Sequence, residues 1–227
     1  MARKLVIAID GPAASGKSTT ARLAARELGY LYIDTGAMYR AMGLKARRLG
    51  IPFSDTEDIA RMADATAISQ RPDDGGVVTL LDGEDVSAAI RQPEISQAAS
   101  DISTIPAVRR RLVKLQQQMG RDGGVVMEGR DIATVVFPDA DVKVFMQAGS
   151  AERARRRQAE LAARGITTDL DALERQIAAR DRQDSERNDS PLACAADAVV
   201  IDTTGLTVAQ QVEQVVALAN QKMQAGR

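Results

Sequence analysis

The segment GPAASGKS at residues 11–18 has the spacing G-x-x-x-x-G-K-S of a phosphate-binding loop. Gly11 and Gly16 allow the backbone to curl around phosphate oxygens without a clash from Cβ. Lys17 provides a positive charge for β- and γ-phosphates, and the Ser18 hydroxyl is suited to ligate Mg²⁺. Backbone N–H groups at the start of the next helix also favour anions. We expect a nucleotide and Mg²⁺ on Gly11, Pro12, Ala13, Ala14, Ser15, Gly16, Lys17, Ser18 and Thr19.

Two further motifs suit a second, smaller anion. DTGAMYR carries Arg40 into the start of a helix, and EGRD places Arg130 and Asp131 directly after an apolar run. Ligands bind at the carboxyl ends of strands in open α/β sheets, so these side chains are expected at one mouth of the sheet. An exposed helix arginine at 40 and a turn with a surface ion pair at 129–131 are the alternative interpretations.

The segment RDRQDSERND places Arg180, Asp184 and Arg187 at spacings of four and three. On a helix these positions share one face. The arrangement suits binding of an anion, but a solvated ladder of salt bridges would use the same spacing. The sequence alone leaves both interpretations open.

Short apolar runs alternate with longer segments of helical period. The runs indicate strands at 5–9, 30–34, 124–129, 142–146 and 198–202, and the longer segments indicate helices at 17–28, 37–49, 108–119, 151–163, 170–184 and 208–224. Continuous apolar runs predict a sheet covered on both faces. The alternation of strands and helices predicts a doubly wound parallel α/β domain.

One region departs from this alternation. The segment VVTLLDGEDVSAAI at 77–90 alternates like a strand, turns at Asp82-Gly83 and then resumes. This pattern is typical of a β-hairpin. We therefore expect a small antiparallel subdomain at about 65–92.

Composition narrows the function further. The 227 residues suit one domain with an appended subdomain, or at most two small domains. A net charge of −1 argues against partnership with a nucleic-acid polymer or an anionic membrane. The chain has one Cys and no His, which excludes a disulfide framework and a histidine general base.

The short apolar run before Asp10 does not match a signal peptide, so we expect a cytoplasmic protein. A monomer is expected because no long apolar seam appears.

Taken in order, the motifs IDGPAASGKST, DTGAMYR, EGRDIATVVFPDAD, SAERARRR and ARDRQDSERNDSPLACAADAVVIDT resemble bacterial-type cytidylate kinase over nearly the whole chain. The most specific piece is GRDIATVVFPDA, which generic P-loop kinases lack. The resemblance implies a nucleoside monophosphate kinase fold. This fold would have a five-stranded parallel sheet flanked by helices, an inserted antiparallel β subdomain and a helical lid. It also implies transfer of the γ-phosphate of ATP to CMP or dCMP.

The same resemblance implies a division of the chain into three parts. The core would comprise 1–34, 93–150 and 166–227, the monophosphate-binding region 35–92 and the lid 151–165. Four arginines occupy five positions in the lid and cannot all face one way. We expect Arg153 and Arg157 to face the ATP phosphates. The alternative is an exposed charged helix.

Roles carried over by position complete the expected site. The catalytic set would be Lys17, Arg130, Arg153, Arg157 and Arg187. The phosphate of CMP would be held by Arg40, Arg130 and Arg187. Cytosine would be read by Ser100, Arg109 and Asp131, and the ribose side would be contacted by Thr35, Arg180 and Asp184. The family often has Ser where this chain has Thr35, and Thr retains the hydroxyl.

Recognition of cytosine has a chemical basis at Asp131. A carboxylate accepts a hydrogen bond from the N4 amine of cytosine. Uracil presents a carbonyl oxygen at the same place, so UMP should be the poorer substrate. A kinase of UMP, another nucleoside monophosphate or a shikimate-like acceptor is the second interpretation. A nucleotide-gated regulator is the third, but the chain lacks the N-K-x-D motif of signalling GTPases and is poor in aromatic residues.

Overall fold

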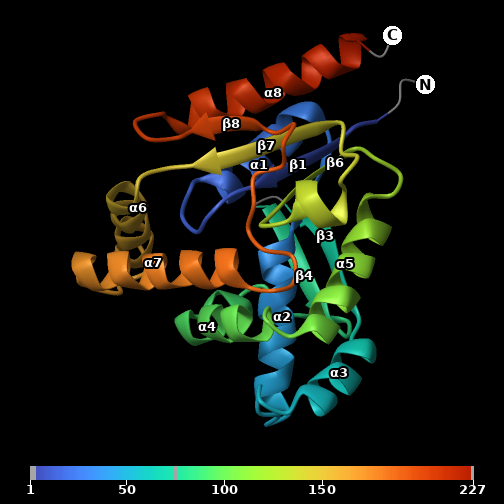
Figure 1. Ribbon diagram of the computed structural model, residues 1–227, viewed down its shortest axis with the longest axis vertical. Coiled ribbons are helices and arrows are strands. Elements are labelled where there is room, and N and C mark those ends of the chain that lie inside the picture. Colours follow the sequence, from blue (N-terminus) through green and yellow to red (C-terminus); the bar gives the residue numbers. More distant parts are fainter. Residues whose placement is uncertain (1–3, 74–75, 226–227) are drawn as a thin grey trace.

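The computed structural model describes residues 4–73 and 76–225. Its central sheet contains β1 (Val6–Asp10), β2 (Leu31–Asp34), β6 (Val125–Gly129), β7 (Val142–Gln147) and β8 (Val199–Asp202). These form a 5-stranded sheet in the order β2-β6-β1-β7-β8, and every pairing is parallel (Figure 1). The predicted parallel α/β fold is confirmed. The chain adds β6 on one side of β1 and β7 on the other, so the carboxyl end of β1 lies at a topological switch point.

Helices cover the two faces of this sheet. On one face, α1 (Lys17–Leu28) and α8 (Val208–Ala225) pack against the apolar side chains of β1 and β7. On the other, the π-helical turn η2 (Ile132–Val136) and α5 (Pro106–Gly120) pack over β6. These two apolar layers hold the strand ends in fixed positions.

A second apolar core lies beyond the carboxyl ends of the strands. It contains α2 (Thr35–Arg48), α3 (Thr56–Asp64), the turn η1 (Ala89–Arg91) and α4 (Pro93–Ile102), packed with one side of α5. The helix α2 begins at Thr35, two residues earlier than predicted. Asp34 is its N-cap and accepts a hydrogen bond from Ala37 N at 2.8 Å.

The predicted hairpin is confirmed and belongs to a 3-stranded antiparallel sheet in the order β3-β4-β5. The strands β4 (Gly76–Leu81) and β5 (Glu84–Asp85) pair around Asp82 and Gly83. Both turn residues have positive φ, of 50° and 89°, as a two-residue hairpin turn requires. The third strand, β3 (Ile68–Asp73), pairs with β4.

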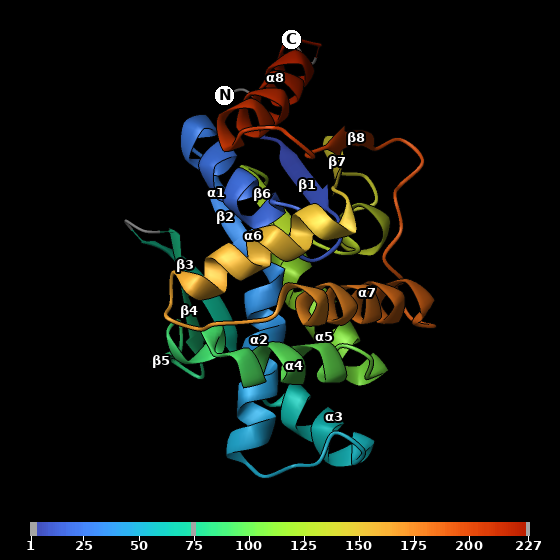
Figure 2. The same cartoon turned by 90° about the vertical axis from the view of Figure 1, so that its left-hand side faces the viewer.

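The helices α6 (Ser150–Ala162) and α7 (Leu170–Glu186) lie side by side at one side of the molecule in Figure 1, the side that faces the viewer in Figure 2. They share a small apolar cluster of their own, formed by Ala154, Leu161, Leu173 and Ile177. This cluster is separate from the two larger cores, so α6 and α7 form one packed pair.

The expectation of a sheet covered on both faces is wrong for β8. This edge strand leaves Val199 and Val200 44% and 50% exposed, while Ile201 is buried against the α8 layer. No helix within the described ranges 4–73 and 76–225 is long and apolar enough to cross a membrane.

Gly43 sets the distance between α2 and α4. A Cβ at this position would lie 3.1 Å from the carbonyl carbon of Ala98 and 3.2 Å from the backbone nitrogen of Ala99. Gly43→Ala normally favours a helix, but here the methyl group would push two packed backbones apart. We expect the variant to lose ~1–3 kcal/mol of unfolding free energy in chemical denaturation.

Gly149→Ala is the control, because nothing lies within 4 Å of a Cβ there. We expect it to change the free energy of unfolding by less than about 1 kcal/mol, the cost of an altered N-cap. A Gly43→Ala variant as stable as the parent protein would show that the two helices can separate without cost.

Candidate active site

The loop at 11–16 joins β1 to α1 and has the shape that its glycines predict. Gly11 and Gly16 have φ of 151° and 93°, which glycine tolerates best. A Cβ on Gly11 would lie 2.1 Å from the Met146 carbonyl oxygen, so the strand β7 leaves no room for another residue. The first N–H groups of α1 are therefore held at the switch point of the sheet, an arrangement that suits an anion.

Residues that follow β8 hydrogen-bond this loop and the first turn of α1. The Thr203 hydroxyl donates to the Ser15 carbonyl oxygen at 2.9 Å. The Thr20 hydroxyl, in the first turn of α1, donates to Gln211 Oε1 at 2.9 Å, and Gln211 is 3% exposed. Sequence reasoning missed Thr203 and Gln211. No sequence signal distinguishes them from ordinary loop and helix residues.

Lys17 lies beside a buried carboxylate that sequence reasoning did not assign. Its Nζ donates to the Pro12 carbonyl oxygen at 2.9 Å and lies 3.9 Å from Glu128 Oε2. Burial, together with the nearby Arg130, lowers the pKa of Lys17 to about 7. Burial raises the pKa of Glu128, which accepts a hydrogen bond from the Tyr32 hydroxyl at 3.1 Å. The sequence offered one signal for a role of Glu128, which is its position at the end of a predicted strand.

Two arginines meet one buried carboxylate at the carboxyl end of β6. Arg130 Nε donates to Asp184 Oδ2 at 2.9 Å, and Arg187 Nη1 lies 3.5 Å from Asp184 Oδ1. Asp184 is 5% exposed, so the solvated ladder and the surface ion pair are wrong interpretations. Burial opposes the charge on Asp184, but Arg130 and Arg180 hold its pKa below the usual value.

Arg180 and Arg40 complete this group. Burial and the neighbouring Arg130 lower the pKa of Arg180 to about 10. Arg40 Nη2 lies 3.0 Å from Asp34 Oδ2, and its charge acts on Arg180 as well. The arginines expected to hold the phosphate acceptor, which lie on α2, directly after β6 and on α7, are therefore close together. We call Arg40, Arg130, Arg180 and Arg187 the arginine cluster.

Several guanidinium N–H groups in this region are buried without an acceptor in the described part of the chain. They are Arg40 Nε, Arg180 Nε, Arg187 Nη2 and, nearby, Arg109 Nε. Buried donors are normally hydrogen-bonded, and like charges gathered at one place repel. Donors of this kind, converging from separate elements, suit a polyanionic ligand.

The expected base-reading residues also lie together. Arg109 is 1% exposed, hydrogen-bonds Asp131 through Nη2 and lies over the Tyr39 ring at 5.6 Å. Ser100 is 5% exposed and pairs with Gln183 of α7. Thr35, expected on the ribose side, donates its hydroxyl to the Glu128 carbonyl oxygen at 2.7 Å.

The arginines of α6 differ in where they point. Arg153 Nη1 donates to the Ala13 carbonyl oxygen at 3.2 Å and to Asp181 Oδ2 at 2.5 Å. Arg156, which was not expected at the site, donates to the Ser15 and Thr203 carbonyl oxygens at 3.4 and 2.7 Å. Arg153 and Arg156 therefore contact the phosphate-binding loop directly.

Arg157 and Arg155 have other surroundings. Arg157 Nη1 donates to Glu160 Oε2 at 2.8 Å, while its charge acts on the buried Arg180. Arg155 is exposed and pairs with Glu152. The interpretation of an exposed charged helix therefore holds for Arg155 but not for the whole of α6.

Asp10 lies close to this site, and both of its carboxylate oxygens are hydrogen-bonded to backbone N–H groups. Its two carboxylate oxygens accept hydrogen bonds from Ile132 N at 2.9 Å and Ala133 N at 2.8 Å. Asp10 thereby fixes the turn that follows Asp131. The carboxylate therefore positions the segment that contains Asp131.

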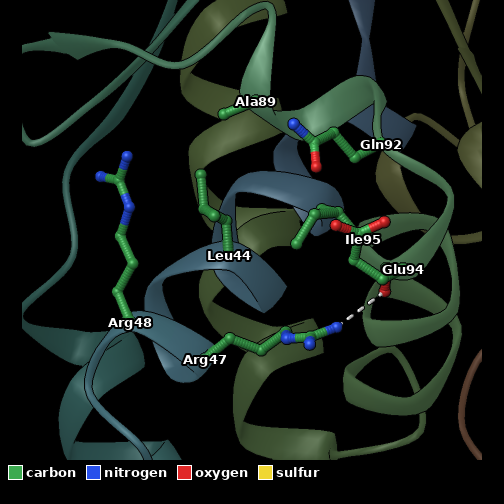
Figure 3. Close-up of a pocket in the computed structure, with 7 residues that line it drawn as sticks. All are labelled: Leu44, Arg47, Arg48, Ala89, Gln92, Glu94 and Ile95. Atoms are coloured by element: carbon green, nitrogen blue, oxygen red, sulfur yellow. Dashed lines mark hydrogen bonds between the residues drawn. The ribbon is translucent and has the colours of Figure 1, made fainter.

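A separate hollow of about 260 Å³ lies between the last turns of α2 and the start of α4 (Figure 3). Leu44, Ala89 and Ile95 contribute apolar side chains to it, and Arg47 and Arg48 lie on its rim. Arg47 donates to the Glu94 carbonyl oxygen, and Arg48 pairs with Glu84 on the surface. The hollow lies at the opposite end of α2 from Arg40 and contains none of the site residues.

Comparison with known proteins agrees with this geometry. The model of the family described as cytidylate kinase matches residues 7–221. A cytidylate kinase from Symbiobacterium thermophilum is 54% identical over 214 residues, covering 94% of this chain and 95% of the relative. One from Pelotomaculum thermopropionicum is 51% identical over 222 residues, covering 97% and 96%.

The fold is also found in solved structures. An uncharacterized protein from Eubacterium ventriosum matches with a TM-score of 0.53 at 11% identity, covering 96% of this chain and 99% of that one. A likeness at this level of identity reflects the fold alone. The family match spans both the phosphate-binding loop and the arginine cluster, and the chain belongs to the cytidylate kinase family.

Proposed function

We propose that this protein transfers the γ-phosphate of ATP to CMP or dCMP, giving ADP and CDP or dCDP. Membership of the cytidylate kinase family supports this assignment. The observation that carries it is a pair of anion sites at the carboxyl ends of neighbouring strands. Backbone amides after β1 form one site, and the arginine cluster beside β6 forms the other. One chain contributes both sites, so the proposal requires no second copy.

On the donor side, the loop at 11–18 and Lys17 hold the ATP phosphates. Residues of this chain also fit Mg²⁺. The exposed Ser18 hydroxyl lies at the start of α1, and Ser18 acts to lower the pKa of the buried Glu128 against the larger effect of burial. The described residues contain no group of three or more His, Cys, Asp or Glu that could hold a metal. This agrees with an ion bound largely by phosphates and water, which neutralises charge on the triphosphate.

On the acceptor side, Arg40, Arg130 and Arg187 hold the phosphate of CMP. Arg130 and Arg187 share the carboxylate of Asp184, and Arg40 pairs with Asp34. Arg40 and Arg187 also have buried donors with no acceptor in the described chain. A guanidinium can bind phosphate through two parallel hydrogen bonds and stays charged when buried. The positive charges of the cluster thus suit an acceptor whose phosphate group carries two negative charges.

The chemistry requires charge neutralisation more than proton transfer. An oxygen of the CMP phosphate attacks the γ-phosphorus of ATP, and the bond from that phosphorus to the β–γ bridging oxygen breaks. The electron pair leaves with ADP. A phosphate dianion needs no general base, which is consistent with a chain that lacks His. Lys17 and the arginines offset the repulsion between the two polyanions.

On the base side, Asp131 accepts from the cytosine amine, with Arg109 and Ser100 beside it. Arg109 Nε has no hydrogen-bond acceptor in the described chain and is available to the acceptor edge of a pyrimidine. Thr35, Arg180 and Asp184 lie on the ribose side. The Thr35 oxygen, whose hydrogen is directed at Glu128 O, can still accept a hydrogen bond.

The lid is assigned to α6 together with α7. The lid segment expected from the sequence, 151–165, shares its apolar cluster with α7, so the two helices should move as one body. Closure of the lid would bring Arg157 toward the reacting phosphates and exclude water that would otherwise hydrolyse ATP. Arg153, which already contacts the loop, would stay beside the ATP phosphates.

A coupled assay across acceptors tests the function directly. We expect ATP-dependent turnover with CMP and dCMP, with kcat/KM for UMP lower by at least about tenfold, because uracil offers an acceptor where Asp131 needs a donor. AMP, GMP and shikimate should be poorer still. Equal turnover of UMP and CMP would contradict the proposed base contacts. A preference for shikimate, or slow ATP hydrolysis with no acceptor dependence, would support one of the two other interpretations.

The lid arginines are tested by comparing Arg157→Ala with Arg155→Ala. Arg157 lies near the arginine cluster, whereas Arg155 is exposed. We expect Arg157→Ala to lower kcat by about tenfold or more while the Kd for CMP changes little, because the contact forms only on closure. The Arg155→Ala variant should keep the parent kcat. Equal kcat values for the two variants would remove Arg157 from the mechanism.

The lowered pKa of Lys17 predicts proton uptake when ATP binds. The free protein has a pKa of about 7 at Lys17, and bound phosphates should raise it. ATP affinity should therefore fall as pH rises above about 7, and binding should take up a proton at about pH 8. Calorimetry in two buffers of different ionisation enthalpy measures this uptake. Lys17→Arg is the control, because its guanidinium stays protonated, and identical enthalpies for the parent protein in both buffers would contradict the prediction.

A further inference from the structure

Gln183 of α7 forms a reciprocal pair with Ser100 of α4. The Ser100 hydroxyl donates to Gln183 Oε1 at 3.2 Å, and Gln183 Nε2 donates to the Ser100 carbonyl oxygen at 3.1 Å. The two residues come from helices that are distant in sequence. No catalytic or binding role has been given to Gln183 so far, although it lies directly before the buried Asp184.

The orientation of the Gln183 amide is determined by its partner. A carbonyl oxygen can only accept, and the Ser100 oxygen accepts from both Gln183 Nε2 and the Ser103 hydroxyl, the latter at 2.7 Å. A flipped amide would place two acceptors face to face at this carbonyl. The amide nitrogen must therefore face the backbone, and the amide oxygen must face the Ser100 hydroxyl.

This orientation fixes the direction in which the Ser100 hydroxyl can act. A serine hydroxyl has one hydrogen and two lone pairs. When the hydrogen is directed at Gln183 Oε1, the oxygen presents only lone pairs to any other group. Ser100 is 5% exposed, so bulk water offers little competition for that hydrogen.

Hydrogen bonds connect this serine to the residues expected to read cytosine. Arg109 Nη1 donates to the Ser103 carbonyl oxygen at 3.3 Å, and Arg109 Nη2 hydrogen-bonds Asp131. Ser103 in turn donates to Ser100. The backbone carbonyl of Ser100 and the carboxylate of Asp131 are therefore linked through Ser103 and Arg109.

We propose that Gln183 is a specificity-determining positioning residue, which holds the Ser100 hydroxyl as a hydrogen-bond acceptor. The inference rests on the proposed function and on Ser100 facing the base. The amine of cytosine has two hydrogens, one for Asp131 and one for the Ser100 oxygen. The O4 atom of uracil would meet lone pairs on both sides. Discrimination between the two bases thus depends on a residue that need not touch either one.

The test compares Gln183→Met with Gln183→Glu by kcat/KM for CMP and UMP. Methionine removes both hydrogen bonds and frees the hydroxyl to donate to uracil. We expect it to lower the CMP-to-UMP ratio by about tenfold, the effect of one hydrogen-bond mismatch, mainly through faster use of UMP. Glutamate keeps an acceptor for the hydroxyl but loses the donor to the Ser100 carbonyl oxygen, so its ratio should stay closer to that of the parent than the ratio of Gln183→Met. Gln176→Met, at an exposed position two turns earlier on α7, controls for changes to the helix.

Repeating the measurement in a Ser100→Ala background separates the inference from the function on which it rests. With the hydroxyl gone, Gln183→Met should no longer change the ratio. If Ser100→Ala itself leaves the ratio unchanged, the base-reading role of Ser100 is wrong, and the role of Gln183 fails with it. If Ser100→Ala changes the ratio but Gln183→Met does not, or lowers both activities equally, the role of Gln183 alone is overturned. Thermal melting of each variant verifies that it is folded.

Discussion

Repulsion between partly buried guanidinium groups is the constraint on which the rest of the site depends. Arg130 and Arg180 are partly buried within electrostatic reach of each other and of Lys17, and the pKa values of Arg180 and Lys17 are lowered in part as a result. Two such charges 4 Å apart repel by roughly 4 kcal/mol at the effective dielectric near a protein surface. Asp184 offsets part of this repulsion by contacting Arg130 and Arg187 together. A phosphate dianion would offset more, so the fold itself favours an anionic acceptor.

The scaffold keeps these charges from moving apart. Arg40 is held at the start of α2 by Asp34, which is also the cap of that helix. The side-chain amide of Gln70 in β3 accepts from Asp34 N at 3.0 Å and donates to the Asp34 carbonyl oxygen at 2.8 Å, and so attaches the small sheet to the end of β2. On the donor side, Thr203 hydrogen-bonds Ser15 of the loop, and Gln211 hydrogen-bonds Thr20 in the first turn of α1. Each of the two proposed phosphate sites is therefore held in place by residues of an element that is distant in sequence.

Much of this arrangement could be predicted from the sequence, because the signals are local. The P-loop spacing, the apolar runs of the parallel strands and the turn at Asp82-Gly83 each depend on a few neighbouring residues. The gathering of Arg40, Arg130 and Arg187 followed from a general rule, since carboxyl ends of parallel strands share one edge of a sheet. The resemblance to cytidylate kinases added the roles of residues that no spacing rule could assign.

The remaining features depend on contacts between distant segments and could not be predicted. Gln211 and Thr203 look like ordinary helix and loop residues until β8 is paired with β7. Nothing in the run RARRR distinguishes Arg156 from Arg157, because the choice depends on where α6 leaves the sheet. The exposure of Val199 and Val200 follows from the edge position of β8, whereas an apolar run alone indicates a covered strand.

A crystal structure with CMP and a non-hydrolysable ATP analogue tests the central claim most directly. The account predicts the triphosphate along the amides of residues 11–18 and the CMP phosphate among the guanidinium groups of Arg40, Arg130 and Arg187. The acceptor oxygen should point toward the γ-phosphorus. A CMP phosphate bound away from these arginines, or one separated from the γ-phosphate by protein atoms, would contradict the account.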